Sequence, residues 1–141
     1  MSEASPFVWE SRIRFVDTDA SRRIHYTSIF RHFEAAEDEF LRHIGCAYQH
    51  VEDREVAYPR VHVEADYLAP IGYDDLLATR VSVERVGASS FTLAFEAAVD
   101  GRPSARGKIT VVAMDRKTRR ARPLPEAFAA GLRAQMGRGG E

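Results

Sequence analysis

One amphipathic helix constrains this chain more than any other feature. Apolar residues recur at spacings of four, three, four and four between Ile29 and Ile44, which places them on one helical face. Thr27 or Ser28 precedes this stripe and can cap the helix, and Gly45 follows where a helix often ends. We therefore predict one helix of about 17 residues that must bury its apolar face against another layer.

Most of the remaining chain alternates apolar and polar side chains with the period of a β-strand. The alternating segments are Trp9–Phe15, 60–67, 77–84, 91–96 and 105–114. In the first of them, Trp9, Ile13 and Phe15 share one face. Short turns separate the last four strands, and Asp100-Gly101 is a strong hairpin signal, so we expect an antiparallel meander. One sheet and one long apolar helix then give an α+β architecture, with the sheet wrapped around the helix.

Composition bounds the class of protein. With 141 residues, 45% of them hydrophobic, the chain fits a single domain, which we place at residues 7–136 and end with a short helix over Glu126–Met136. A formal net charge of -1 argues against a nucleic-acid partner, and the basic run at 116–122 is interpreted as a solvated turn. The lone Cys46, the acidic N-terminal segment and the lack of a membrane-length apolar run predict a cytoplasmic protein. The histidines show no metal-ligand spacing, so we expect no metal site.

Three segments carry a resemblance to a known family. The run from Phe15 to Tyr26 resembles the strand-to-helix loop of the 4-hydroxybenzoyl-CoA thioesterase family, which has an Asp-x-Asp, a small-residue turn, an apolar pair and an aromatic residue before the central helix. Segment 63–75 resembles the second strand and turn of the same family, and residues 112–115 followed by 122–125 resemble its ending. The resemblance implies a single hotdog domain, an antiparallel sheet around one long central helix. It also implies hydrolysis of acyl-CoA thioesters, with CoA present only as part of the substrate.

The same resemblance implies which residues act. It assigns the catalytic carboxylate to Asp19, the second aspartate of the pair, and the oxyanion donor to the backbone N–H of Tyr26. This assignment agrees with helix physics, because the first N–H groups of a helix lack internal partners and carry the positive end of its dipole. The alternative for Asp19 is a carboxylate that only caps the loop. Asp17 is expected to be structural and to accept backbone hydrogen bonds within the loop.

Four charged residues near this loop are unusual. Arg22 and Arg23 stand where relatives often have a small and an apolar residue, which bears on the backbone path of the loop. They are either solvated or placed to meet an anionic group of the substrate, such as the phosphates of CoA. Glu37 falls inside the apolar stripe of the helix and Glu34 at its edge. Either one could assist or replace Asp19, and the alternative for Glu37 is an ion pair with an arginine or histidine across a dimer.

Partners and rival functions follow from these expectations. An open sheet edge predicts pairing into a homodimer or homotetramer. The acyl group could be carried by CoA or by an acyl carrier protein. A non-catalytic hotdog module that binds an acyl group or a protein is the main alternative to a thioesterase. A hotdog hydratase or dehydratase is a weaker hypothesis, because the loop before the central helix lacks the His-plus-Asp pattern that such enzymes place there.

Overall fold

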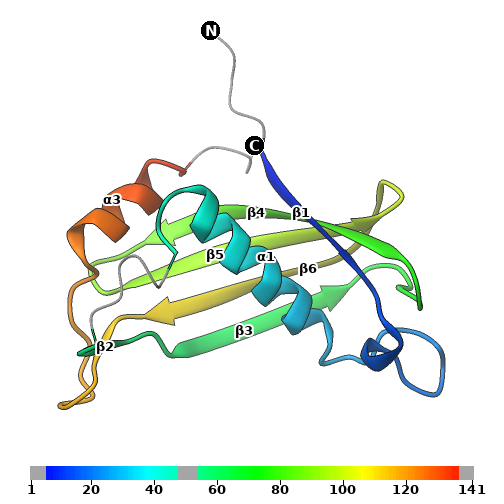
Figure 1. Cartoon of the computed structure of the whole chain (residues 1–141), viewed down its shortest axis with the longest axis horizontal. Helices are drawn as coiled ribbons and strands as arrows, with labels where there is room; N and C mark the ends of the chain where they lie inside the picture. Colours follow the sequence, from blue (N-terminus) through cyan, green and yellow to red (C-terminus); the bar gives the residue numbers. More distant parts are fainter. Residues whose placement is uncertain (1–5, 48–53, 137–141) are drawn as a thin grey trace, which may run out of the picture.

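The computed structural model describes residues 6–47 and 54–136 of the chain, and it has one main sheet with a long helix across one face (Figure 1). The five strands of this sheet lie in the order β1-β4-β5-β6-β3. They are β1 (Phe7–Arg12), β3 (Arg60–Tyr67), β4 (Leu76–Val86), β5 (Ser90–Val99) and β6 (Arg102–Val112). A second, two-stranded sheet pairs β2 (Val56–Ala57) with β7 (Met114–Asp115). The helices are α1 (Ile29–His43), α3 (Glu126–Arg133) and the short 3-10 helix η1 (Phe15–Asp17).

Helix α1 confirms the strongest prediction from the sequence. Its apolar stripe is buried, and the Phe33 ring stacks on Phe95 of β5 with 4.7 Å between ring centroids. The helix ends at Ile44 and Gly45, and Gly45 has the positive φ of 79° that favours glycine. The expected side-chain cap at its start is wrong. Ser28 already has helical backbone angles and makes no side-chain cap, because the chain enters α1 through a continuous turn.

The order of the strands corrects the predicted meander. Only β4, β5 and β6 form one, with the expected tight turn at Asp100 and Gly101, where both φ angles are positive. Strand β3 pairs with β6 rather than with its sequence neighbour β4, whose free edge is taken by β1. The connection between β3 and β4 therefore crosses the end of the sheet, and the wrapped sheet keeps α1 on its concave face (Figure 1).

Strand β1 ends earlier than its alternation predicts. The Asp17 carboxylate accepts a hydrogen bond of 2.8 Å from the Arg14 backbone N–H, which turns the chain into η1. Phe15 therefore leaves the inner face that it was expected to share with Ile13. Its side chain is 79% exposed and meets Tyr73 edge to face, whereas Ile13 is fully buried.

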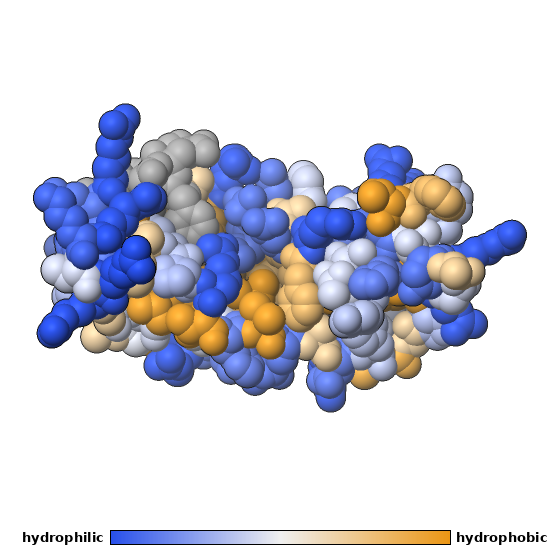
Figure 2. Space-filling model, turned by 90° about the horizontal axis from the view of Figure 1, so that it is seen from below, coloured by the Kyte–Doolittle hydropathy of each residue, from blue (hydrophilic) through white to orange (hydrophobic). Residues whose placement is uncertain are grey.

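One edge of the main sheet is open. All but one of the residues of β3 are exposed, including Val61 (59%) and Val63 (48%), and no other strand of the described residues pairs with its outer edge. Figure 2 views the molecule from the side on which β3 lies in Figure 1 and shows apolar surface set among hydrophilic surface there. An edge of this length with apolar side chains is suited to pairing with another strand.

Candidate active site

The loop between η1 and α1 is a compact hairpin with a defined backbone path. Asp19 N–H donates to the Arg23 carbonyl at 3.1 Å, and Arg22 N–H donates to the Asp19 carbonyl at 2.9 Å. Arg22 has a φ of 67°, in the left-handed region that glycine occupies at little cost. The small residue that relatives often have at position 22 therefore fits a backbone that needs a positive φ there. The arginine keeps this path at a cost of about 1 kcal/mol.

Asp19 lies on the outside of this hairpin as an exposed carboxylate. Its Oδ1 accepts hydrogen bonds from the Ser21 hydroxyl at 2.6 Å and from the Ser21 backbone N–H at 2.9 Å. These donors, the hydroxyl first, hold the pKa of Asp19 below its usual range, so the group is ionised at neutral pH. One oxygen thus caps the loop, as the simpler interpretation predicts. No residue of the described segments hydrogen-bonds the other oxygen, Oδ2, which remains available for chemistry.

The backbone N–H of Tyr26 is an available donor at the entrance to α1. Among residues 6–47 and 54–136 no acceptor takes this hydrogen. The Tyr26 carbonyl is fixed, because the Tyr67 hydroxyl of β3 donates to it. His25 stacks on the Tyr26 ring at 4.7 Å, and its Nδ1 accepts from the Thr27 backbone N–H at 3.2 Å. The peptide of Tyr26 is therefore held with its N–H unused, where the start of α1 adds a positive potential.

Asp17 is the buried anchor of the loop. The predicted backbone hydrogen bond is present, from Arg14, and the carboxylate also accepts from the side chains of Arg31 and His32. Burial by itself raises the pKa of Asp17, but the Arg14 N–H, Arg31 and His32 outweigh it and the pKa is lowered. Sequence reasoning missed His32. The signal was available, because position 32 falls on the same helical face as Ile29 and a polar residue there needs a partner.

A cavity of about 240 Å³ lies between α1 and the β3 edge. Its lining residues are Phe30, Arg31, Glu34, Glu37, Arg60, Val63 and Ile109. Glu37 is fully buried, as its place in the stripe predicts, and it forms an ion pair with Arg60. The expected partner across a dimer is thus corrected to an arginine of the same chain. Glu34 is exposed at the mouth of the cavity.

A second hollow, of about 340 Å³, lies where the loop before α1 meets the end of β3. It is lined by Arg23, Ile24 and the segment 67–71, and Tyr67 connects it to the Tyr26 carbonyl. Arg22 and Arg23 are both exposed, and neither forms an ion pair within the described part of the chain. Strand β3 therefore contributes to both hollows, because Arg60 and Val63 line the first and Tyr67 lines the second.

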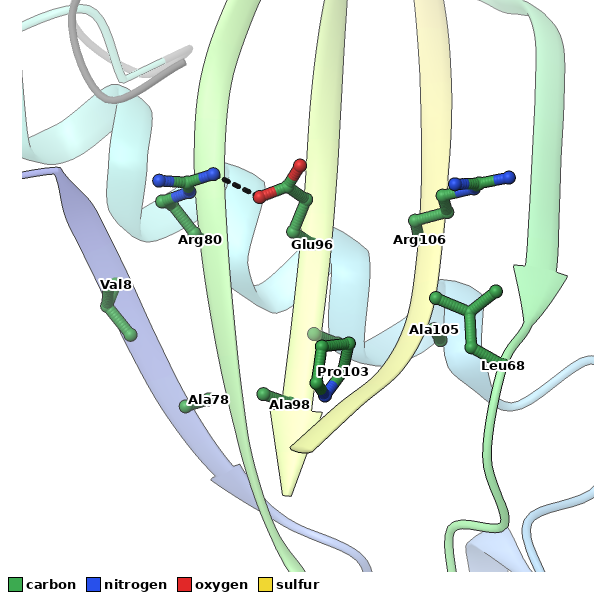
Figure 3. Close-up of a pocket in the computed structure, with 10 residues that line it drawn as sticks. Val8, Leu68, Ala78, Arg80, Glu96, Ala98, Pro103, Ala105 and Arg106 are labelled. Carbon is green, nitrogen blue, oxygen red and sulfur yellow. Dashed lines mark hydrogen bonds and ion pairs between the residues drawn. The ribbon is translucent and has the colours of Figure 1, made fainter. Parts of the chain in front are cut away.

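A larger hollow of about 460 Å³ lies on the opposite face of the sheet, away from α1 (Figure 3). Alanines and Pro103 form its floor. Arg80 pairs with Glu96, and Arg106 pairs with Asp66 at 3.2 Å. Its charges are thus already matched, and Asp19 and Tyr26 do not line it.

Two further observations concern metal ligands and membrane spans. Within residues 6–47 and 54–136, no group of three or more His, Cys, Asp or Glu side chains is arranged to hold a metal ion. Over the same residues, no helix has the length and apolar character needed to cross a membrane. The loop before α1 carries an N–H donor at Tyr26 and a carboxylate at Asp19, the two kinds of group that hydrolysis of a carbonyl compound uses.

Comparison with known proteins places this chain in a thioesterase-like superfamily. The sequence model of the thioesterase-like superfamily matches residues 13–132. A 1,4-dihydroxy-2-naphthoyl-CoA hydrolase of Synechococcus sp. (strain CC9605) is 33% identical over 93% of this chain and 93% of its own length. A 1,4-dihydroxy-2-naphthoyl-CoA thioesterase structure from Synechocystis covers 91% of this chain and 96% of that one, with a TM-score of 0.83 at 21% identity. A gentisyl-coenzyme A thioesterase structure covers 89% of this chain and 99% of that one, with a TM-score of 0.80 at 24% identity. At these lower identities the two structures establish the shared hotdog fold.

Proposed function

Because the chain belongs to the thioesterase-like superfamily, we propose that it is an acyl-CoA thioesterase in which Asp19 is the catalytic carboxylate and the Tyr26 backbone N–H is the oxyanion donor. One observation carries this assignment. An exposed, ionised carboxylate and an unused backbone N–H belong to the same short loop at the start of α1. Both groups that thioester hydrolysis needs are therefore present together.

The proposed reaction converts an acyl-CoA and water into a carboxylic acid and CoA thiol. The thioester oxygen accepts from the Tyr26 N–H, and the positive end of α1 stabilises the negative charge that develops on it. Asp19 either removes a proton from an attacking water, or its Oδ2 attacks the carbonyl carbon to form a mixed anhydride that water then hydrolyses to the free acid and regenerated Asp19. A C–O bond forms, the C–S bond breaks, and the thiolate takes up a proton. The lowered pKa of Asp19 supports this role, because the carboxylate is charged at neutral pH.

The residues that line the cavity beside α1 are suited to bind an aromatic acyl group that carries a polar substituent. Helix α1 begins at Ile29, and Glu34 and Glu37 are five and eight residues further on, so at about 1.5 Å per residue they lie roughly 7.5 and 12 Å along the helix from its start. Helix side chains tilt back toward the N-terminus. Glu34 is thus placed to accept a hydrogen bond from a hydroxyl on the far side of a bound ring, while Phe30 and Val63 contact its faces. Glu37 lies about one turn deeper, too far along α1 to replace Asp19 at the thioester.

The other hollow suits the CoA portion of the substrate. Arg23 lines it, and its guanidinium has no ion pair among the described residues. Guanidinium groups bind phosphate through paired hydrogen bonds, so Arg23 is the proposed contact for a CoA phosphate. This arrangement favours CoA over an acyl carrier protein as the acyl donor.

A second copy of the chain completes the proposed enzyme. Strand β3 borders both hollows and leaves its outer edge unpaired in the described structure, with Val61 and Val63 exposed. Pairing of β3 with the same strand of another copy would satisfy its backbone groups and wall off the site from water. We therefore propose a homodimer as the smallest active form.

A panel of acyl-CoA substrates tests the function. The purified protein is mixed with hydroxylated aryl-CoAs, unsubstituted aryl-CoAs and aliphatic acyl-CoAs, and the released thiol is followed over time. We expect turnover with the hydroxylated aryl group highest, and a fall in kcat of about 10²-fold or more for Asp19→Asn. The amide oxygen of the substituted side chain can still accept from Ser21, so the variant removes the charge and preserves the turn.

Glu34→Gln is the matched comparison. We expect it to reduce the preference for hydroxylated substrates and to leave hydrolysis of the unsubstituted aryl-CoA within about threefold of wild type. Full activity in Asp19→Asn with loss in Glu34→Gln would transfer the catalytic role to α1. Absence of turnover with every acyl-CoA and acyl carrier protein substrate would favour a non-catalytic binding module.

A further inference from the structure

A buried chain of hydrogen bonds runs beneath the loop that carries Asp19. The Ser11 hydroxyl on β1 meets His32 Nδ1 at 2.8 Å, and His32 Nε2 meets Asp17 Oδ2 at 3.0 Å. An ionised carboxylate can only accept, so Nε2 carries the hydrogen of the bond to Asp17, while Nδ1 forms the hydrogen bond with the Ser11 hydroxyl. The chain therefore links β1, α1 and η1 through His32.

The same aspartate controls the backbone on both sides of the hairpin. Asp17 lies two residues before Asp19, and its carbonyl accepts from the His25 N–H at 2.7 Å. His25 is the residue directly before Tyr26, so this hydrogen bond fixes the start of the peptide that presents the oxyanion donor. The position of the hairpin relative to α1 thus depends on where Asp17 is held.

These contacts are too enclosed to act on substrate directly. Asp17 is 4% exposed and His32 is 8% exposed. A buried carboxylate and imidazole cost free energy unless both are hydrogen-bonded, and here each oxygen and each ring nitrogen has a partner. The loop also contacts β3 through the Tyr67 hydroxyl and the β3–β4 connection through backbone hydrogen bonds, while the Asp17 network attaches it to the side chains of α1.

We propose that Asp17 and His32 are positioning residues that hold Asp19 and the Tyr26 N–H in register across the thioester carbonyl. The proposal rests on the proposed thioesterase function for its kinetic consequence, and on the hydrogen bonds alone for its structural one. Loss of the pair lets the hairpin shift against α1. The chemical step slows, because carboxylate and oxyanion donor no longer act on one carbonyl group, while the hollows that bind the substrate keep their walls.

Two substitutions of His32 distinguish a positioning role from a general effect on the stability of the protein. His32→Gln places its amide nitrogen near the former Nε2 and can still donate to Asp17. His32→Asn places its amide near the former Nδ1, where it reaches Ser11 but not Asp17. Glu96→Gln is the control, because it removes an exposed ion pair on the opposite face of the sheet.

The measurements are kcat, KM, affinity for a non-hydrolysable thioether analogue of the best substrate, and amide hydrogen exchange. We expect His32→Asn to lower kcat by about 10- to 100-fold, with KM and analogue affinity within about threefold of wild type. His32→Gln should recover most of kcat, and Glu96→Gln should leave it unchanged. The amides of Arg14 and His25, which donate to Asp17, should exchange faster in His32→Asn and stay protected in His32→Gln.

Each contrary result has a distinct meaning. Equal behaviour of His32→Asn and His32→Gln, or a change carried by KM and analogue affinity instead of kcat, would overturn the positioning role. Unchanged exchange at His25 in His32→Asn would overturn it independently of any assay. If wild type hydrolyses no thioester, the proposed function fails, and the exchange comparison still decides whether the pair holds the loop.

Discussion

Gly107 on β6 is the position where one added methyl group should disturb the whole site. A Cβ built there would lie 2.4 Å from the Glu64 carbonyl oxygen of β3 and 2.6 Å from Cε2 of Phe33 on α1. Neither neighbour can yield easily. The carbonyl belongs to the backbone of a paired strand, and the Phe33 ring is fully buried and stacked on Phe95. Gly107→Ala must therefore move α1, β3 or both.

The expected loss of stability can be worked from these contacts. Overpacking a core costs about 1–3 kcal/mol, and a backbone obstacle places this site at the upper end. Replacing glycine stiffens the unfolded chain and returns about 0.4–1 kcal/mol. The net expectation is a loss of about 2 kcal/mol in the free energy of unfolding, or roughly 6–8 °C in Tm for a chain of this size.

Urea and thermal unfolding followed by circular dichroism measure this loss. Gly72→Ala is the control, because the nearest atoms to its added Cβ lie at 3.7 Å and 3.8 Å, which is ordinary contact. Its stability should stay within about 1 kcal/mol of wild type. Phe33→Leu combined with Gly107→Ala should cost less than the sum of the two single changes, because the smaller side chain relieves the clash. A Gly107→Ala protein as stable as wild type would refute the close packing of α1 on β6 and β3.

The remaining predictions concern the loop and the edge strand. Ser21→Ala removes the hydroxyl that most lowers the Asp19 pKa, so the acid limb of kcat should move to higher pH with activity at pH 7 unchanged; a tenfold loss at pH 7 would contradict this reasoning. Arg22→Gly relieves a left-handed φ of 67°, and thermal unfolding should show stability equal to wild type or up to about 1 kcal/mol higher, whereas Arg22→Val should be destabilised. Val63→Lys places a charge on the open β3 edge, and analytical ultracentrifugation should show a shift toward monomer; an unchanged mass would exclude pairing through β3.

The local elements of this protein were predictable because their signals are local. The apolar stripe between Ile29 and Ile44 determines α1, since a helix with one apolar face must bury it wherever the rest of the chain lies. The Asp100-Gly101 turn determines a hairpin because both residues tolerate a positive φ. The burial of Glu37 followed from its angle on the same helix. The loop with Asp19 and Tyr26 was located by its resemblance to a family, and their catalytic roles stay predictions.

Only the tertiary structure decided which distant groups meet. The sequence by itself suggested β3 beside β4, but β3 pairs with β6, since a strand's alternation says which face it buries and nothing about which edge it joins. The contact of Asp17 with His32 spans 15 residues, and that of Tyr67 with the Tyr26 carbonyl spans 41. Such pairs depend on how the wrapped sheet brings its ends to the start of α1. Local sequence therefore determined the individual helices, strands and turns. The pairing of distant strands and side chains, which local sequence does not encode, brought the residues of the candidate site together.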